Sequence, residues 1–377
     1  MQAQFKKIRD VKDLKGKRVL LRLDLNVPII GEEVRDDFRI RRSIPTLEFL
    51  RSQGARTIIM SHLETEAVKS LARVAKYVSQ TVPIKAFVTS IDDAKSVIAS
   101  MQDGEIIMLE NLRLDPGEKE NSPVFAGKLA ALADIYVNDA FAVCHRAHAS
   151  IVSIPRMLPS YAGPLLTQEV EELSKAFNPP HPFLFVLGGA KFETKLPLIE
   201  KFLNIADYVF VGGALSNDIF KEKGYEVGHS LVSDARVNLR HIESNPKLLV
   251  PTDVVTSSPM SRDVKSPDAV GYDDSILDAG PRTITDLSDL LNDVQFVLWN
   301  GPLGDYEKGF SSGTENLAKA IVESGVQSIL GGGDTIAAVA KLGLLDKFSF
   351  VSTGGGAMLE FLAKGTLPGI DALKAGL

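Results

Sequence analysis

The sequence is poor in cysteine and in long apolar runs. Cys144 is the single cysteine among 377 residues. One thiol excludes an internal disulfide and the usual Cys-based zinc sites, so a reducing cytoplasm fits best. No run approaches the roughly 18 to 20 apolar residues that a membrane span needs, and no apolar segment follows the basic residues at the start of the chain. We therefore expect a soluble, cytoplasmic protein that is neither exported nor bound to a membrane.

Excess positive charge is also missing, because the net charge is -6. This value argues against general nucleic-acid binding. The charge is unevenly distributed: up to residue 165 there are 24 Lys and Arg against 20 Asp and Glu, and beyond it 18 against 28. Of the 17 arginines, 13 lie in the first part. Because the arginine fork suits carboxylate and phosphate groups, we expect the N-terminal part to hold a small anionic ligand.

The two familiar phosphate-binding signatures are absent as well. The chain contains no G-x-x-x-x-G-K-[ST], and no G-x-G-x-x-G lies directly between a predicted strand and helix. These absences disfavour a P-loop enzyme and an ordinary dehydrogenase.

Short runs rich in Val, Ile and Leu alternate with amphipathic stretches, which predicts parallel sheets covered by helices. The length favours two domains, possibly three. In the first part, strands are predicted at 18–23, 57–60, 84–88, 105–109 and 134–137. Near residue 165 the pattern changes to one apolar helical face formed by Leu166, Val170, Leu173 and Phe177, before a proline-rich segment at 178–182. We place the domain boundary at this helix.

Beyond the boundary, five predicted strands each run into glycines or an Asn-Gly-Pro turn. The strands are 183–187, 208–211, 296–299, 328–330 and 348–351. Any single glycine pair also fits a simple tight turn. Five such turns at strand ends predict a polyphosphate site, because glycine lets backbone amides approach phosphate beside the next helix. Lys191 and Lys195, four apart behind Gly188-Gly189, are predicted to project from one helical face toward it.

Several polar residues allow two interpretations. Asp334 either caps the helix that follows the glycines at 331–333 or ligates the magnesium of a nucleotide. Glu307 either accepts hydrogen bonds from ribose hydroxyls or is a surface carboxylate. Cys144, His145 and His148 also resemble a nucleophile pair or a metal site, but adjacent positions point differently and no fourth ligand is suggested.

In the first part, polar groups follow the predicted strands and converge at one sheet edge if those strands are parallel. They are Arg22, Asp24, Asn26, His62, Arg113, His145, Arg146 and His148, with a cluster of Arg35, Arg39, Arg41 and Arg42 nearby in the sequence.

Nine motifs in order closely resemble the phosphoglycerate kinase family over nearly the whole chain. They are Arg-Leu-Asp-Leu-Asn-Val-Pro at 22–28, Met-Ser-His-Leu at 60–63, Glu-Asn-Leu-Arg at 110–113, Asn-Asp-Ala-Phe at 138–141, His-Arg-Ala-His at 145–148, Gly-Gly-Ala-Lys at 188–191, Trp-Asn-Gly-Pro at 299–302, Gly-Gly-Gly-Asp-Thr at 331–335 and Ser-Thr-Gly-Gly-Gly at 352–356.

The resemblance implies an α/β chain with two Rossmann-like domains, each a parallel sheet flanked by helices. The expected parts are a phosphoglycerate-binding domain at 1–164, a hinge helix at 165–178 and a nucleotide-binding domain at 179–365, with the tail 366–377 returning to the first domain. It implies reversible phosphoryl transfer between 1,3-bisphosphoglycerate and ADP, giving 3-phosphoglycerate and ATP with Mg²⁺, by hinge bending. We expect a glycolytic or gluconeogenic monomer with these small-molecule substrates.

By position, the resemblance assigns glycerate binding to Asp24, Asn26, Arg39, His62, Arg113 and Arg146. It assigns nucleotide binding to Gly189, Lys195, Gly213, Asn300, Pro302, Glu307, Gly332, Gly333, Asp334 and Thr335, with Asp334 meeting the metal. Arg39 and Lys191 are the expected catalytic cations, since phosphoryl transfer mainly needs alignment and charge around the equatorial oxygens.

One departure from the family concerns the loop after His62. The family usually has Gly-Arg where this chain has Glu64-Thr65. An inward carboxylate would repel a substrate phosphate, and Arg41 or Arg42 is a candidate to compensate. The departure keeps two alternatives open: a nucleotide-binding relative with impaired catalysis, or a kinase for another phosphorylated carboxylate.

Overall fold

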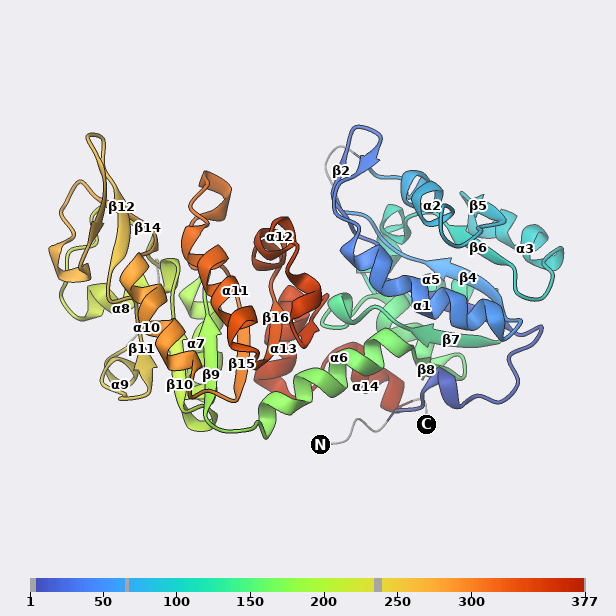
Figure 1. Ribbon diagram of the computed structural model, residues 1–377. Helices are drawn as coiled ribbons and strands as arrows, with labels where there is room; N and C mark the ends of the chain where they lie inside the picture. Colours follow the sequence, from blue (N-terminus) through green and yellow to red (C-terminus); the bar gives the residue numbers. More distant parts are fainter. Residues whose placement is uncertain (1–4, 65–67, 234–238, 376–377) are drawn as a thin grey trace. The chain divides into compact units, whose positions relative to one another are not determined.

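A computed structural model describes residues 5–64, 68–233 and 239–375 of the chain. The chain divides into two compact units (Figure 1). The first unit comprises Met1–Glu171 and Lys364–Leu377, and the second comprises Glu172–Ala363. Each unit is described by itself below.

The first unit is built on a parallel sheet that has six strands among its described residues. Their order is β5-β6-β4-β1-β7-β8, so the chain starts near the middle of the sheet and extends it in both directions. The strands are β1 (Arg18–Arg22), β4 (Arg56–Met60), β5 (Ala86–Val88), β6 (Ile106–Leu109), β7 (Ile135–Asn138) and β8 (Ser160–Ala162). A two-stranded hairpin of β2 (Ile29–Ile30) and β3 (Glu33–Val34) follows β1.

Helices cover both faces of this sheet, as the continuous apolar runs of its strands require. Val19 and Leu21 of β1 pack in one core with Leu47 and Leu50 of α1, whereas Leu20 is buried on the opposite face. The helices of this unit are α1 (Phe38–Ser52), α2 (Ala72–Val78), α3 (Ile91–Ala99), α4 (Pro116–Lys119), α5 (Pro123–Ala130) and α14 (Pro368–Ala375). Helix α6 (Pro164–Ser174) contains the boundary between the two units.

Helix α14 belongs to the first unit although it lies at the end of the chain. The amide of Gly369 donates to the carbonyl oxygen of Cys144 at 2.8 Å. A Cβ at Gly369 would lie 2.8 Å from Ile151, so glycine permits this close packing. Residues 376–377 of the predicted returning tail lie outside the described residues.

The second unit has a parallel sheet whose described strands follow the order β11-β10-β9-β15-β16-β17. This is the Rossmann order, in which the direction of winding reverses between β9 and β15. The strands are β9 (Phe183–Leu187), β10 (Tyr208–Val211), β11 (Leu248–Leu249), β15 (Phe296–Asn300), β16 (Gln327–Gly331) and β17 (Phe350–Val351). The helices are α7 (Phe192–Ile205), α8 (Ala214–Glu222), α9 (Arg240–Glu243), α10 (Pro281–Leu291), α11 (Ser312–Ser324), α12 (Gly333–Lys341) and α13 (Gly355–Lys364).

The prediction of an α/β chain with two helix-flanked parallel sheets is confirmed. The sequence did not reveal a further antiparallel sheet of order β13-β12-β14 in the second unit. It consists of β12 (Val254–Ser257), β13 (Arg262–Lys265) and β14 (Ser275–Ala279). The first of these strands is half-buried and the second largely exposed, so neither forms the apolar run that marks the central strands.

Three predicted segments have different bounds in the structure. The helix expected at 165–178 is α6, which begins at Pro164, ends at Ser174 and continues as a 3₁₀ turn, Lys175–Phe177. The strands expected at 84–88 and 348–351 are shorter, because only Ala86–Val88 and Phe350–Val351 form ladder pairs. Among the described residues, no helix is long and apolar enough to cross a membrane.

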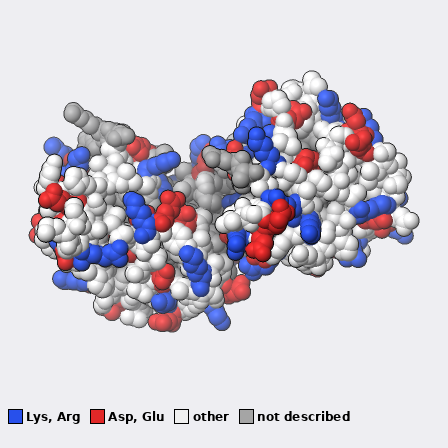
Figure 2. Space-filling view, turned by 90° about the horizontal axis from the view of Figure 1, so that it is seen from above, with Lys and Arg blue, Asp and Glu red and all other residues white. Residues whose placement is uncertain are grey.

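Charged groups of both signs are interspersed on the molecular surface. In the view of Figure 2, Lys and Arg side chains lie among Asp and Glu side chains on each unit. The cationic groups described below are therefore local features of a mixed surface.

Candidate functional site

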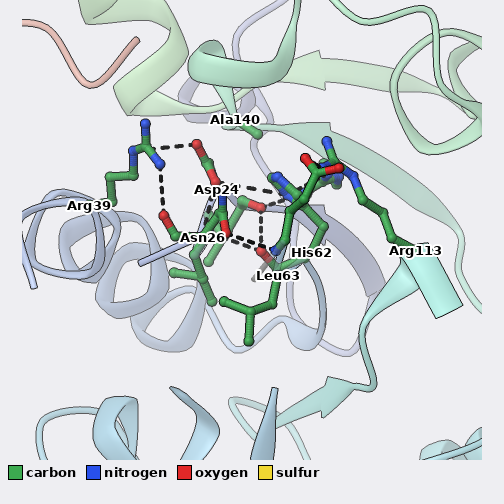
Figure 3. A network of polar contacts seen from close by, with 12 residues as sticks. Asp24, Asn26, Arg39, His62, Leu63, Arg113 and Ala140 are labelled. Atoms are coloured by element: carbon green, nitrogen blue, oxygen red, sulfur yellow. Dashed lines mark hydrogen bonds and ion pairs between the residues drawn. The ribbon is translucent and has the colours of Figure 1, made fainter. Parts of the chain in front are cut away.

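The first unit gathers charged side chains at the carboxyl edge of its sheet (Figure 3). Asp24 and Asn26 follow β1, His62 follows β4, and Arg113 follows β6. Arg39 approaches them from the first turn of α1. Ligands of open parallel sheets bind at this edge, so the structure brings five of the six predicted glycerate-binding residues to a suitable place.

Asp24 organises the centre of this cluster. Arg39 Nε lies 3.5 Å from Asp24 Oδ2, and Arg39 Nη1 donates to the carbonyl oxygen of Asn26 at 2.7 Å. The amide of Asn26 donates to Asp24 Oδ1 at 3.1 Å. Burial opposes ionisation of Asp24, but the charge of Arg39 and the Asn26 amide help to hold its pKa below the usual value. A carboxylate thus fixes the guanidinium that is expected to act on the phosphoryl group.

His62 is buried and neutral. Burial is the main reason that its pKa falls to about 3, and the charges of Arg22 and Arg113 lower it further against the effect of Asp24. Arg22 Nη2 lies 3.2 Å from His62 Nδ1. Because a guanidinium only donates, Nδ1 accepts and the proton resides on Nε2. His62 therefore offers an N–H donor to an anion without carrying a charge.

Arg22 is held by a buried layer that the sequence did not reveal as functional. Its Nε donates to Ser150 Oγ at 2.9 Å, and Ser150 Oγ donates to Glu118 Oε1 at 2.6 Å. Arg22 and Glu118 are fully buried. Arg22 and Glu118 are connected through Ser150, and the two charged residues are far apart in the sequence. Neither spacing nor periodicity in the sequence links residue 22 to residue 118, so the sequence does not indicate this connection.

Arg113 is already paired in the structure. Its Nη1 donates to Glu64 Oε2, and Lys119 Nζ contacts the other oxygen of the same carboxylate at 3.0 Å. The amide of Glu64 donates to Asn26 Oδ1 at 3.0 Å. The residue that departs from the family pattern thus lies inside the cluster. Thr65, the second departure, is outside the described residues.

Arg146, the remaining predicted glycerate ligand, is exposed. Burial lowers the pKa of His148, and the charges of Arg113, Arg22 and Arg146 lower it further. Arg146 therefore lies within electrostatic range of the cluster's edge.

The other arginines of the sequence cluster point elsewhere. Arg41 Nε contacts Asp37 at 2.8 Å, and Arg42 Nη2 donates to Gln168 at 3.0 Å. Both line a separate cavity of 490 Å³ with Lys7 and Glu171. The cations that contact Glu64 are Arg113 and Lys119, whereas the contacts given above for Arg41 and Arg42 are with Asp37 and Gln168.

The second unit has a cavity of 520 Å³ at the point where its sheet reverses direction. Gly189 after β9 and Pro302 after β15 line it, and the Gly189 amide donates to the carbonyl oxygen of Pro302 at 2.8 Å. Gly213, Glu307 and Asp334 line the same cavity. Five predicted nucleotide-binding residues therefore meet in one cavity.

Glycine is required where the turns of this cavity touch. Gly213 has φ +62°, and a Cβ there would lie 2.7 Å from the Gly189 nitrogen and 2.9 Å from the Pro302 oxygen. A side chain at Gly213 would therefore push the two turns apart.

The two lysines have different positions from those predicted. Lys191 precedes α7 as its N-cap, in the left-handed region at φ 64°, and does not share a helical face with Lys195. Lys195 folds back, and its Nζ donates to the Gly188 carbonyl oxygen at 2.6 Å. Burial lowers the pKa of Lys195 to about 8, with Asp334 opposing the shift. Lys191 is exposed and lines a smaller cavity of 240 Å³.

The amino end of α12 is open toward a ligand. Gly332 is its N-cap, and Asp334 lies within the first turn, so Asp334 does not cap this helix. The first amides of a helix have no intrahelical acceptor and attract anions. Thr335 Oγ1 is buried with no hydrogen-bond partner among the described residues. A phosphate at this helix end would satisfy both kinds of donor.

Asn300 and Glu307 complete the predicted nucleotide contacts. Asn300 is buried at the end of β15, where its Nδ2 lies 3.4 Å from Met358 Sδ. Glu307 is exposed on a 3₁₀ turn, Tyr306–Lys308, at the rim of the cavity. Asp278 also lines this cavity, and burial raises its pKa to about 6; the sequence analysis did not single it out.

The described residues contain no group of three or more His, Cys, Asp or Glu that could hold a metal ion. Cys144 is buried, and burial raises its pKa to about 12, which excludes a reactive thiolate at neutral pH. Asp334 fits Mg²⁺ as one oxygen donor beside a nucleotide, because Mg²⁺ usually takes one or two carboxylates and completes its shell with phosphates and water.

A Rossmann-ordered sheet with a glycine-walled cavity at its reversal point is typical of nucleotide-binding α/β proteins. Comparison with known proteins defines the family. The model of the family "Phosphoglycerate kinase" matches residues 8–365. Phosphoglycerate kinase from Dictyoglomus turgidum is 40% identical over 97% of this chain and 98% of its own length. The enzyme from Thermosipho africanus is 41% identical over 97% of each chain.

Solved structures agree with the sequence comparison. Phosphoglycerate kinase from Coxiella burnetii matches with a TM-score of 0.84 and 38% identity, covering 98% of this chain and 99% of its own. The Pyrococcus horikoshii enzyme matches with a TM-score of 0.86 and 30% identity over the same shares. The chain belongs to the phosphoglycerate kinase family. It is therefore a glycolytic enzyme, a kinase that uses a nucleotide and a phosphoglycerate as substrates.

Proposed function

We propose that the chain catalyses reversible transfer of a phosphoryl group between the acyl phosphate of 1,3-bisphosphoglycerate and ADP, giving 3-phosphoglycerate and ATP. The first unit binds the glycerate through Asp24, Asn26, Arg39, His62, Arg113 and Arg146. The second unit binds the nucleotide through Gly189, Lys195, Gly213, Asn300, Pro302, Glu307 and Gly332 to Thr335. The observation that carries this division is the pairing of a cationic side-chain cluster in one unit with a glycine-walled cavity in the other.

The reaction needs little covalent chemistry from the protein. In the direction that consumes ATP, the glycerate carboxylate attacks the γ-phosphorus, the bond to the β-phosphate oxygen breaks, and ADP leaves. No general base is required, because the carboxylate is already ionised. Arg39 and Lys191 supply positive charge to the transferring group, and the Nε2–H of His62 donates to the glycerate. The amides at the amino end of α12 and the hydroxyl of Thr335 hold phosphate oxygens.

Mg²⁺ fits beside Asp334, where it would neutralise charge on the nucleotide phosphates. Substrates held by separate units must meet with water excluded, so we propose that α6 acts as the hinge of a closing motion. The cytoplasmic location and the monomeric state are parts of the proposal as well; the single buried thiol supports the former, and light scattering tests the latter.

A second candidate function is a kinase for another phosphorylated carboxylate, or a nucleotide-binding relative with impaired catalysis. The pairing of Glu64 with Arg113 favours this alternative, because the carboxylate occupies a guanidinium that the glycerate is proposed to use.

A coupled assay with 3-phosphoglycerate, ATP and Mg²⁺ tests the proposal. We expect turnover by the wild type and a loss of about 100-fold or more in kcat for Lys191→Ala, with nucleotide affinity less affected. Lys319→Ala, an exposed lysine of α11, is the matched control and should keep wild-type rates. Absence of wild-type turnover despite normal ADP binding by calorimetry would refute the proposal and favour the second candidate.

A further inference from the structure

Glu64 lies where the substrate's anion is proposed to bind. Its carboxylate bridges Arg113 Nη1 and Lys119 Nζ, one oxygen on each cation. The Arg113 side chain is only 8% exposed, whereas those of Lys119 and Glu64 are 52% and 57% exposed. The pairing is therefore a contact between an exposed carboxylate and a buried guanidinium of the site.

The backbone of Glu64 is tied to the same cluster. Its amide donates to Asn26 Oδ1 at 3.0 Å, and the neighbouring amide of Leu63 donates to Asn111 Oδ1 at 3.2 Å. Asn111 caps the 3₁₀ turn Leu112–Leu114 that carries Arg113. Residue 64 is thus held within reach of Arg113 by the loop's own hydrogen bonds.

A carboxylate and a phosphate compete for a guanidinium through the same geometry, two oxygens against a planar fork of N–H donors. Arg113 Nε is buried without a hydrogen-bond partner among the described residues, so the guanidinium still has an unused N–H donor. A ligand anion that takes Nη1 must displace Glu64. The displaced side chain can stay in contact with Lys119, which lies farther out.

We propose that Glu64 is a specificity-determining residue that acts as an internal competitor of the substrate's anion for Arg113. The proposal rests on the function proposed above and deepens it. The internal carboxylate weakens binding of every anion at Arg113. It favours ligands that carry several negative charges, because these outweigh one carboxylate where a single charge does not.

The electrostatics support a competitor that is always charged. A hydrogen bond from Lys119 is the largest cause that lowers the pKa of Glu64, and the charge of Arg113 adds to it against partial burial. Glu64 therefore stays ionised throughout the neutral range, so the charge of the competing carboxylate does not vary between pH 6 and 8.

The decisive variant is Glu64→Gln, which keeps the shape and removes the charge. We expect calorimetry to give a Kd for 3-phosphoglycerate that is about fivefold lower than in the wild type, and a Kd for inorganic phosphate lowered in the same direction. In the coupled assay, the KM for 3-phosphoglycerate should fall in parallel while kcat changes by less than about twofold.

Glu105→Gln is the matched control. Glu105 contacts Lys85 at 2.5 Å just before β6, at the opposite edge of the same sheet. This change alters the net charge of the unit equally, so we expect it to leave both dissociation constants within about 1.5-fold of the wild type. An equal gain in both variants would overturn the proposal in favour of a general charge effect.

The ligand complex gives a direct structural test. A crystal structure of the wild type with 3-phosphoglycerate should show Arg113 on the ligand and Glu64 displaced from it. A retained Glu64–Arg113 pair in that complex, or an unchanged or raised Kd in Glu64→Gln, would overturn the proposal and make Glu64 a support for Arg113. If the wild type has no turnover but Glu64→Gln binds the anions more tightly, the reaction assignment fails and the competition stands.

Discussion

The two candidate sites use different kinds of hydrogen-bond donors, side chains in the first unit and mainly the backbone in the second. In the first unit, the donors are side chains from distant segments, and two of the cations are already held by a carboxylate: Arg39 by Asp24, and Arg113 by Glu64. In the second unit, the walls are glycine turns and a helix terminus, with Lys195 bonded to a backbone oxygen.

The difference has a physical reason. Long cationic side chains lose conformational freedom and hydration when they are gathered, so each needs an anion beside it until the ligand arrives. Backbone amides are fixed by the fold itself and stay oriented without a partner side chain. In a site made of cationic side chains, one nearby carboxylate can change the affinity for an anion. In a site made of backbone amides, the affinity depends on the space left between the turns.

Removal of a charge should break the first site most severely. We expect Arg39→Ala to lower kcat/KM for 3-phosphoglycerate by about 100- to 1,000-fold, because a charge placed on the reacting group is lost. Asp24 would also be left buried without its closest cation. Steady-state kinetics with varied 3-phosphoglycerate measures the effect.

Arg41→Ala controls for this change on the same helix. Arg41 is exposed and pairs with Asp37, outside the cluster. Its removal should keep kcat/KM within about twofold of the wild type. Comparable losses in both variants would mean that Arg39 acts through general charge and not through its contacts.

Steric crowding should break the second site and leave the first intact. We expect Gly213→Ala to raise the KM for ATP roughly tenfold or more without changing the KM for 3-phosphoglycerate. A Cβ between the two turns would move backbone amides away from the phosphate. A hydrogen bond from an amide to a charged phosphate is worth about 1.5 to 3 kcal/mol. Gly224→Ala is the matched control. It also has positive φ, +82°, but no atom lies within 4 Å of a Cβ there. A similar KM change in both would contradict the crowding argument.

A smaller effect should appear in the pH dependence of stability. His62 has a folded-state pKa of about 3, below the ordinary 6.5, so the unfolded chain binds a proton that the folded chain does not. The contribution of neutral His62 to the free energy of unfolding is therefore fully present above about pH 6.5. It falls as the pH drops toward 3, by at most about 1.4 kcal/mol per pH unit.

His62→Gln should remove this dependence. Urea denaturation followed by circular dichroism at pH 7, 6 and 5 measures the free energy of unfolding. Between pH 7 and pH 5, this free energy should fall by about 2 kcal/mol more in the wild type than in the variant. His181→Gln, at an exposed imidazole paired with Asp207, controls for loss of a histidine. Equal pH dependence of wild type and His62→Gln would show that His62 does not resist protonation in the folded chain.

Much of the second unit could be predicted because its central strands are buried on both faces. The bounds of β9 and β10 coincide with the apolar runs at 183–187 and 208–211. Such strands need continuous apolar residues, and the glycines that follow mark where the backbone turns. The antiparallel β12, β13 and β14 escaped prediction, because half-buried and exposed strands carry no such run.

Side-chain partners could not be predicted in the same way. The pattern identified Lys191 and Lys195 as a pair but not that α7 begins between them, with Lys191 in the left-handed region. Likewise, the sequence marked Glu64 as a departure without indicating that it reaches Arg113, 49 residues away.

The sequence alone determined the α/β class, the two parallel sheets, the family and the residues to inspect, because burial patterns and ordered motifs are local along the chain. Only the tertiary structure decided how these residues act on one another: the neutral His62 beside Arg22, the lysine folded onto Gly188, and the carboxylate of Glu64 on Arg113. These interactions join residues from separate loops. Their strength depends on distance and burial, which folding sets.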